Sequence, residues 1–284
     1  MMQDWVGMHE ISAAIAGLLG LLIGSFLNVV IYRLPKMMER QWATECDEHS
    51  GMAPTPIEPF NLMVPRSACP HCGHQIRWFE NVPVFSYLLL RGKCSKCHTP
   101  ISARYLIVEI ATGVLFAYCV WQWGFNASGL TWSVFAATLL TLAFIDWDTT
   151  LLPDDLTLPL LWLGLVASSL HLTQVSLNSA LWGAVAGYLS LWSVYWAFKL
   201  LTGKEGMGYG DFKLFAALGV WFGWETLIPI ILLASVIGAI VGIVMKFKSA
   251  LRDGGYVPFG PFLSGAGLAA LFFGPVTLRH AVGL

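Results

Sequence analysis

Two aspartates stand at the ends of apolar runs that lie far apart in the sequence. Asp146 lies in FIDWD, and Asp211 follows the alternating glycines of EGMGYGD. Ionisable side chains at the edge of apolar segments are costly to place and commonly serve function. Two facing carboxylates cannot both ionise cheaply, so the pair shares a proton: one acts as general base for water and the other as acid. This is the chemistry of an aspartyl protease.

The neighbours of these acids leave alternatives open. Asp148 follows Asp146 by two residues, so on a helix the two side chains point roughly 200° apart and only one can face a partner. The glycines before Asp211 allow positive φ and close approach of the backbone to a partner. Asp154 and Asp155 follow Pro153, which is typical of a helix N-terminus. Glu109, in the next apolar run after the cysteines, is a possible supporting residue.

Four cysteines form a separate constellation in the long polar stretch. Their pattern is C-x2-C-x21-C-x2-C, made by Cys69, Cys72, Cys94 and Cys97. This spacing is close to that of zinc ribbons, in which four thiolates close a tetrahedron around Zn²⁺. Such a site has no open position and is structural. Two disulfides are the alternative, which a reducing cytoplasm disfavours.

The elements that must hold these residues are apolar helices. The chain has 284 residues, of which 56% are hydrophobic and only 12% charged, and a membrane span needs about 20 consecutive apolar residues. We predict an all-α polytopic membrane protein with about eight spans. The third is short and the sixth very short, and a seven-span alternative merges the sixth and seventh around Gly223. The predicted spans are Ile11–Ile31, Tyr105–Trp123, Leu130–Ile145, Leu156–Leu172, Leu177–Leu200, Phe212–Phe222, Leu227–Met245 and Phe259–Val276.

The basic residues predict the orientation of these spans. With eight spans, 15 of the 16 Lys and Arg residues fall on one side, among them Lys246, Lys248 and Arg252 after the seventh span, and only Arg279 falls on the other. Excess Lys and Arg mark cytoplasmic loops, so we expect a periplasmic N-terminus. The acids Asp4 and Glu10 precede or begin the first run, which we interpret as a span and not a signal peptide. A net charge of −1 argues against a nucleic-acid partner.

Three regions follow from this layout. Residues 1–34 form the first span, residues 35–104 form a cytoplasmic loop with a small zinc-ribbon-like module, and residues 105–284 form the membrane core that carries the acids. The loop begins with an acidic, Pro-rich linker at 45–59. Its aromatic stretch RWFENVPVFSYLLLRGK suits a module that lies against the membrane surface. Small residues at Gly24 and Ser25, Gly183 and Gly187, and Gly238 and Gly242 predict close helix packing.

Several motifs together resemble those of bacterial prepilin peptidases, also called type IV leader peptidases, of the GxGD class of aspartyl proteases. They are GSFLNVVIYRLP, ENVPVFSYLLLRGKC with its flanking cysteine pairs, RYLIVE, IDWDTTLLPDDLTLP, GMGYGDFKLFAALG and VPFGPFLSGAG. The resemblance covers nearly the whole chain. It implies that Asp146 and Asp211 are the catalytic pair.

The resemblance also implies substrates and a second reaction. Members cleave basic leader peptides from type IV prepilins and type II secretion pseudopilins at the cytoplasmic face of the inner membrane. Members with the cysteine loop generally also methylate the new N-terminus with S-adenosylmethionine. For that donor the resemblance points, more weakly, to Gly92 and Lys93 in RGKC.

Two other classes of protein compete with this interpretation. A transporter could use paired acids and broken helices as an ion site, but its halves should be inverted repeats, which the sequence does not show, and it leaves the cysteine module unexplained. A non-catalytic membrane assembly factor is a further alternative.

Overall fold

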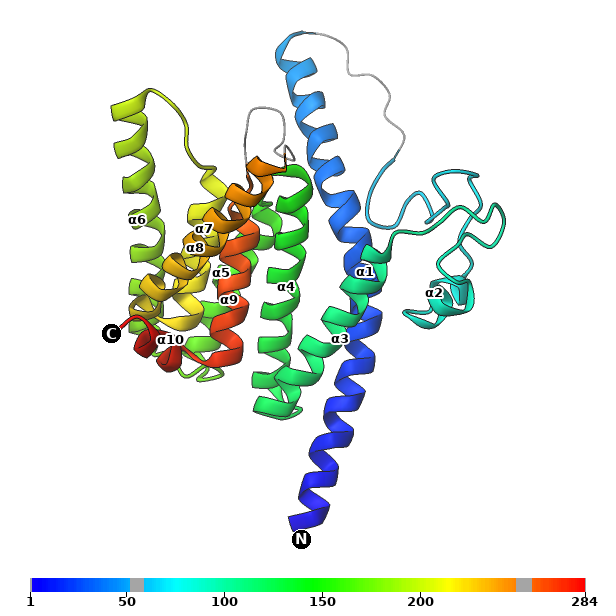
Figure 1. The fold of residues 1–284 in the computed structure, drawn as a ribbon, viewed down its shortest axis with the longest axis horizontal. Coiled ribbons are helices and arrows are strands. Elements are labelled where there is room, and N and C mark those ends of the chain that lie inside the picture. Colours follow the sequence, from blue (N-terminus) through cyan, green and yellow to red (C-terminus); the bar gives the residue numbers. More distant parts are fainter. Residues whose placement is uncertain (1, 52–58, 249–256, 284) are drawn as a thin grey trace. The chain divides into compact units, whose positions relative to one another are not determined.

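The computed structural model describes residues 2–51, 59–248 and 257–283, and this part of the chain is helical (Figure 1). Two isolated β-bridges, in the cysteine module, are its only strand-like pairings among these residues. The chain divides into two compact units, Met1–Ser133 and Val134–Leu284.

The first unit is built on two long helices, α1 (Met2–His49) and α3 (Ala103–Trp123), which run side by side (Figure 1). Glycines allow the close approach: a Cβ at Gly20 would lie 2.7 Å from the Thr112 carbonyl oxygen, and one at Gly24 would lie 2.8 Å from the Glu109 Cα. The segment between these helices carries the short helices η1 (Trp78–Asn81) and α2 (Phe85–Leu89). Helix α4 (Ala127–Thr149) begins in this unit.

The second unit is arranged around α7 (Tyr209–Phe222), which contacts α5, α6, α8 and α9. Every residue of α7 from Asp211 onward is buried except Lys213. Its closest neighbour is α6, where Gly183 and Gly219 leave no room for a Cβ on either backbone. The other elements are α5 (Asp154–Ser169), α6 (Leu177–Thr202), η2 (Trp224–Thr226), α8 (Leu227–Phe247), α9 (Gly260–Phe273) and α10 (Pro275–Ala281).

Four segments of the described chain are long and apolar enough to cross a membrane: His9–His49, Ala103–Trp123, Ala127–Thr149 and Trp224–Phe247. A fifth results if α9 and α10, which are bent by 109°, count as one span. Helices α5 and α7 are shorter, with 16 and 14 residues, and α6 is long enough but rich in Trp, Tyr and Ser. Length and composition therefore support four or five spans, fewer than the eight that we predicted.

A helix nevertheless occurs at each of the eight predicted places. Two details of the prediction are wrong, and its seven-span alternative is also excluded. The third helix is not short, because α4 has 23 residues. The first helix does not end near residue 31, since α1 continues through Pro35 to His49 and includes the start of the expected linker. The sixth and seventh do not merge, because Gly223, with φ of 82°, ends α7. Arg252 and linker residues 52–58 lie outside the described residues.

The glycine pairs pack helices together, as expected. A Cβ at Gly187 would lie 2.7 Å from the Phe215 carbonyl oxygen, and one at Gly238 would lie 3.1 Å from the Phe262 ring. The first of these contacts joins α6 to α7, and the second joins α8 to α9.

We therefore expect Gly183→Ala to destabilise the protein by about 1–3 kcal/mol, because the added methyl group overpacks a backbone contact that cannot move aside. Thermal unfolding in detergent, followed by tryptophan fluorescence, measures the effect. The matched control is Gly265→Ala on α9, where a Cβ would meet nothing within 4 Å. That change should be neutral or stabilise by up to about 1 kcal/mol. Equal effects at the two positions would contradict the packing argument.

Candidate functional site

The second unit brings Asp146 and Asp211 together. Asp146 is near the end of α4 and Asp211 is in the first turn of α7, and each residue is only 5% exposed. The two carboxyl groups are close enough for their charges to interact. Oδ1 of Asp211 is buried and has no hydrogen-bond partner among the residues that the structure describes. A buried polar atom without a partner is unfavourable, so this oxygen is available to a ligand.

A third element holds Asp146 in place. The backbone N–H of Gly260, the first residue of α9, donates a hydrogen bond of 2.9 Å to Oδ2 of Asp146. The first N–H groups of a helix have no partner within the helix and are free to bind an anion. A Cβ at Gly260 would lie 2.6 Å from Oδ2 of Asp146, so only glycine fits here. We quoted its motif VPFGPFLSGAG without assigning Gly260 a role. A glycine that opens a helix after a Pro-rich turn was the available signal.

The alternating glycines before Asp211 let a neighbouring side chain pack close to the backbone, and they do not adopt positive φ angles. Positive φ occurs at Gly203 but not at Gly206, Gly208 or Gly210, so this part of the expectation is wrong. A Cβ at Gly210 would lie 2.6 Å from that of Leu152. A Cβ at Gly260 would meet the same leucine at 3.1 Å. Leu152 therefore packs against both the glycine that precedes Asp211 and the first residue of α9, which bonds to Asp146.

The neighbouring acids are placed differently. Asp148 is exposed whereas Asp146 is buried. The 200° separation on a helix predicted that only one of the two faces a partner, and the resemblance implied that this one is Asp146. Asp154, in the first turn of α5, forms an ion pair with Lys213 of α7 at 2.7 Å. This pair joins α5 to α7 beside Asp211, so Asp154 does more than favour the start of its own helix.

The four predicted cysteines form one cluster in the first unit, with all four Sγ atoms within 4.8 Å of one another. Sγ of Cys69 lies 3.7 Å from that of Cys97, and Sγ of Cys72 lies 4.0 Å from that of Cys94. Four thiolates about 2.3 Å from a central metal would be separated by about 3.8 Å. The nearby histidines are not members of the cluster. The geometry therefore fits a metal held by four sulfurs.

The backbone forms the same knuckle at each cysteine pair. Cys69 N–H donates to the His74 carbonyl, and Cys94 N–H donates to the Thr99 carbonyl. The residue after each second cysteine, Gly73 or His98, has positive φ. Two matching turns thus point two sulfurs each toward a common centre, which the spacing alone had indicated.

Glu80 ties the first knuckle to η1. It accepts a hydrogen bond of 2.8 Å from the Arg77 backbone N–H and lies 3.2 Å from Nε2 of His74. Hydrogen bonds from the backbone of Arg77 and the side chain of Ser95 lower the pKa of Glu80 to about 2. This carboxylate is therefore ionised at neutral pH and helps to hold the module together.

Gly92 and Lys93 lie next to the second knuckle. Gly92 is buried with φ of 66°, and its carbonyl accepts a hydrogen bond from Ile101 N–H. A Cβ at Gly92 would lie 2.9 Å from the Tyr87 hydroxyl oxygen. Lys93 is exposed. Gly92, which the resemblance implied for donor binding, therefore lies against the Tyr87 side chain, and a larger residue at position 92 would displace that ring.

A cavity of about 530 Å³ lies between the cysteine module and helices α1 and α3. Its wall includes two buried ionisable groups, Arg33, 7% exposed, and Glu109, 9% exposed. Oε2 of Glu109 accepts a hydrogen bond of 2.8 Å from Val84 N–H. Arg33 donates to the carbonyl oxygens of Asn61 and Pro65.

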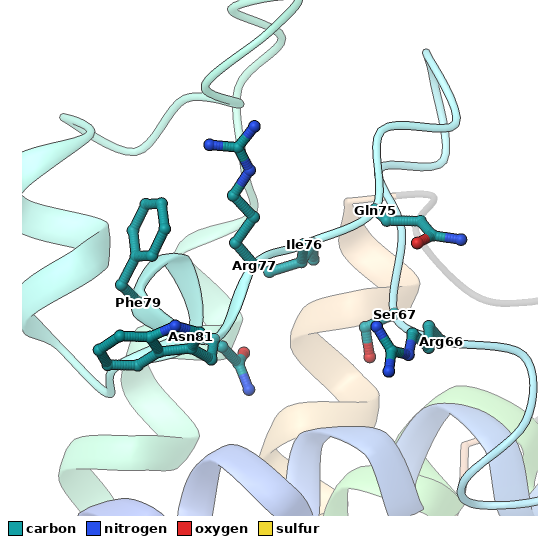
Figure 2. A pocket seen from close by; sticks show the side chains of 8 residues that line it. Arg66, Ser67, Gln75, Ile76, Arg77, Phe79 and Asn81 are labelled. Carbon is teal, nitrogen blue, oxygen red and sulfur yellow. The ribbon is translucent and has the colours of Figure 1, made fainter.

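A second, more open pocket of about 600 Å³ lies on the outside of the module (Figure 2). Gln75, Ile76, Arg77 and Phe79 follow one another along one segment, and Arg66 and Ser67 lie on the segment that faces Gln75 and Ile76 (Figure 2). The neighbouring Trp78 is 82% exposed. Exposed aromatic and basic side chains together are typical of membrane interfaces. The location of the module at the membrane surface stays a prediction.

These features define a helical membrane protein with a buried acid pair in one unit and a four-cysteine cluster in the other. The family comparisons divide the chain in the same way. Residues 18–123 match the model of the bacterial peptidase A24 N-terminal domain. Residues 133–243 match the model of the type IV leader peptidase family. The chain therefore belongs to the type IV leader peptidase family and is an enzyme.

Curated relatives agree over nearly the full length of the chain. It is 53% identical to the prepilin leader peptidase/N-methyltransferase of Pseudomonas aeruginosa, covering 97% of this chain and 96% of the relative. It is 55% identical to the prepilin leader peptidase/N-methyltransferase of Stutzerimonas stutzeri, over 90% of this chain and 89% of the relative. It is 50% identical to the prepilin leader peptidase/N-methyltransferase of Aeromonas hydrophila, over 96% of this chain and 94% of the relative. No solved structure shows significant similarity to the chain.

We expect the purified protein to contain about one metal ion per chain, and Cys69→Ser to reduce this content to near zero, because three sulfurs no longer close the tetrahedron. Metal analysis of freshly prepared, reduced protein measures the content. The control is Cys46→Ser, since Cys46 is exposed on α1 and outside the cluster. Metal-free wild-type protein would contradict the site.

Proposed function

We propose that this chain cleaves the leader peptides of type IV prepilins and pseudopilins with Asp146 and Asp211, and then methylates the new N-terminus. The observation that supports the cleavage site most directly is the burial of two interacting carboxyl groups, one of which has an unpartnered oxygen. Membership of the leader peptidase family, and relatives named as peptidase/N-methyltransferases, support both reactions.

The contacts of the two acids suggest their roles. A hydrogen bond from a backbone N–H stabilises negative charge on a carboxylate, and Asp146 receives one from Gly260. We therefore assign Asp146 as the base and Asp211 as the acid that carries the shared proton. Asp146 takes a proton from water while the water oxygen attacks the scissile carbonyl carbon, and Asp211 donates to the carbonyl oxygen. The departing amine takes its proton from the pair when the C–N bond breaks.

The topology that we propose has eight spans, with the N-terminus in the periplasm of a bacterial inner membrane. Helices at all eight places support it, together with the 15 of 16 basic residues that this arrangement puts on one side. Helices α5 and α7 are short for spans, but α7 is buried inside its unit and need not match the bilayer thickness by itself. The acid pair and the cysteine module then both face the cytoplasm.

Two bound groups complete the proposal. We assign Zn²⁺ to the four cysteines, because a tetrahedral all-thiolate site suits this metal and leaves no open position for catalysis. We assign S-adenosylmethionine as the methyl donor, which supplies an electrophilic methyl group to the amine. Gly92 and Lys93 are proposed to support the donor site through the Tyr87 contact of Gly92. No observation favours the transporter alternative over this family assignment.

The acid pair should behave as one unit. Asp146→Asn and Asp211→Asn should each reduce prepilin cleavage by at least about 10³-fold, and the double variant should be no worse, because residues that act together are not additive. Single-turnover cleavage of a prepilin peptide in detergent, at matched protein levels, tests this.

Asp148→Asn is the matched control, because Asp148 is exposed at the end of the same helix, and it should retain substantial activity. An inactive Asp148→Asn beside an active Asp146→Asn would reverse the assignment within IDWD. Normal cleavage by Asp211→Asn would overturn the protease mechanism.

Cleavage and methylation should be separable by inhibition. Excess S-adenosylhomocysteine should block methylation and leave cleavage unchanged, because water attack and methyl transfer need different groups, which we place in different units. Mass spectrometry of the products measures both reactions in one sample. Parallel inhibition of the two reactions would instead indicate a shared site.

A further inference from the structure

We propose that the cavity between the cysteine module and helices α1 and α3 is the methyl-donor site, with Glu109 facing the cationic part of the donor. This inference rests on the proposed methyl transfer and names the place where it occurs. The cavity lies wholly within the first unit, apart from the unit that carries Asp146 and Asp211.

The size and lining of the cavity fit a small organic cofactor. Its volume of about 530 Å³ is within the range of about 300–1,000 Å³ that is typical of ligand pockets. Apolar and aromatic side chains such as Tyr32, Tyr105 and Leu106 share the wall with hydrogen-bonding groups such as Ser25 and Asn28. Flat aromatic surfaces suit a purine ring, and the polar groups suit a ribose and an amino-acid end.

The charges on the wall carry the argument further. Buried ionisable side chains are normally paired with an opposite charge. Oε2 of Glu109 accepts a hydrogen bond from Val84 N–H. Arg33 is bonded to two carbonyl oxygens and faces the Phe60 ring at 5.7 Å. Within the described part of the chain neither has an ion-pair partner.

A cavity wall that contains an acidic and a basic side chain, Glu109 and Arg33, neither of them in an ion pair within the described residues, suits a ligand that carries charges of both signs. Position 24, against which Glu109 packs, and position 33 are nine residues apart on α1, a rise of about 13 Å. The ligand should therefore be elongated. S-adenosylmethionine is elongated and has a sulfonium, an ammonium and a carboxylate group, whereas an apolar ligand would leave both buried charges unmatched.

The reaction assigned to this cavity is a direct substitution. The neutral N-terminal amine of the cleaved substrate forms a bond to the methyl carbon, the carbon–sulfur bond breaks, and its electron pair stays on sulfur as a neutral thioether. The methylated nitrogen then loses a proton to water. Glu109 attracts the cationic donor more strongly than the neutral product, which favours release of S-adenosylhomocysteine.

This placement also explains how Gly92 could affect methylation without contacting the donor. Tyr87 lines the cavity, and Gly92 leaves room for its hydroxyl group. A larger residue at position 92 would displace this ring. Gly92 is therefore a positioning residue.

The first experiment compares two ligands that differ in charge. Isothermal titration calorimetry measures the affinities of S-adenosylmethionine and S-adenosylhomocysteine for the metal-loaded, full-length protein in detergent. Glu109→Gln should weaken S-adenosylmethionine binding roughly tenfold or more and S-adenosylhomocysteine binding much less, because only the first ligand carries the sulfonium charge. Glu39→Gln, an exposed position on α1, is the control and should change neither affinity. An unchanged ratio of affinities in Glu109→Gln would overturn the role of Glu109.

The second experiment fills the cavity. Leu106 lines it, whereas the next residue, Ile107, does not and is 56% exposed. Leu106→Trp should weaken binding of both ligands at least tenfold, and Ile107→Trp should leave binding unchanged. Metal content and prepilin cleavage in each sample report that the first and second units, respectively, are folded. Full binding by Leu106→Trp would overturn the cavity assignment, whereas a wild-type protein that neither binds nor uses the donor would overturn the methyltransferase function itself.

Discussion

The structure of the second unit depends on burying α7 together with the carboxyl group of Asp211 at its start. A buried carboxyl group is unfavourable unless neighbours satisfy it, and here the helices around α7 enclose it almost completely. The close contact of Gly183 with Gly219 lets α6 lie directly on α7. The ion pair between Asp154 and Lys213 holds α5 at the same end. Helices that pack through their backbones thus keep the Asp211 carboxyl group buried. The favourable free energy of this packing offsets the cost of removing the carboxyl group from water.

The same enclosure gives the two acids different surroundings. Asp146 receives an N–H from the start of α9, while one oxygen of Asp211 has no hydrogen-bond partner in the described residues. Such different environments allow two carboxyl groups of the same type to take different roles, one as a proton donor and the other as a proton acceptor. Gly260 is essential to the difference because any side chain there would contact Asp146. The proposed division between base and acid therefore depends on three separate segments, the end of α4 and the starts of α7 and α9, none of which produces it alone.

The sequence predicted the helices, the cysteine set and the opposite placement of Asp146 and Asp148, because each depends on local periodicity or on the spacing of a few residues. It did not predict the length of α1, because the apolar run ends near Ile31 whereas the helix continues through Pro35 to His49. Nor did it predict the bond from Gly260 to Asp146 or that from Val84 to Glu109, which join positions 114 and 25 residues apart. Contacts of this kind depend on how helices pack, and hydrophobic patterns do not encode their partners residue by residue.

The two reactions have an order that chemistry imposes. The amine that is methylated does not exist until the peptide bond is broken, so the acid pair must act first on every substrate molecule. Water is a reactant in the first step, whereas in the second it competes with the amine for hydrogen bonds and has no role as nucleophile. The proposed acid pair and the proposed donor cavity lie in different units, and this separation suits these opposite needs better than one shared site. The division of the chain into two compact units, each with its own family model, is the arrangement that this incompatibility favours.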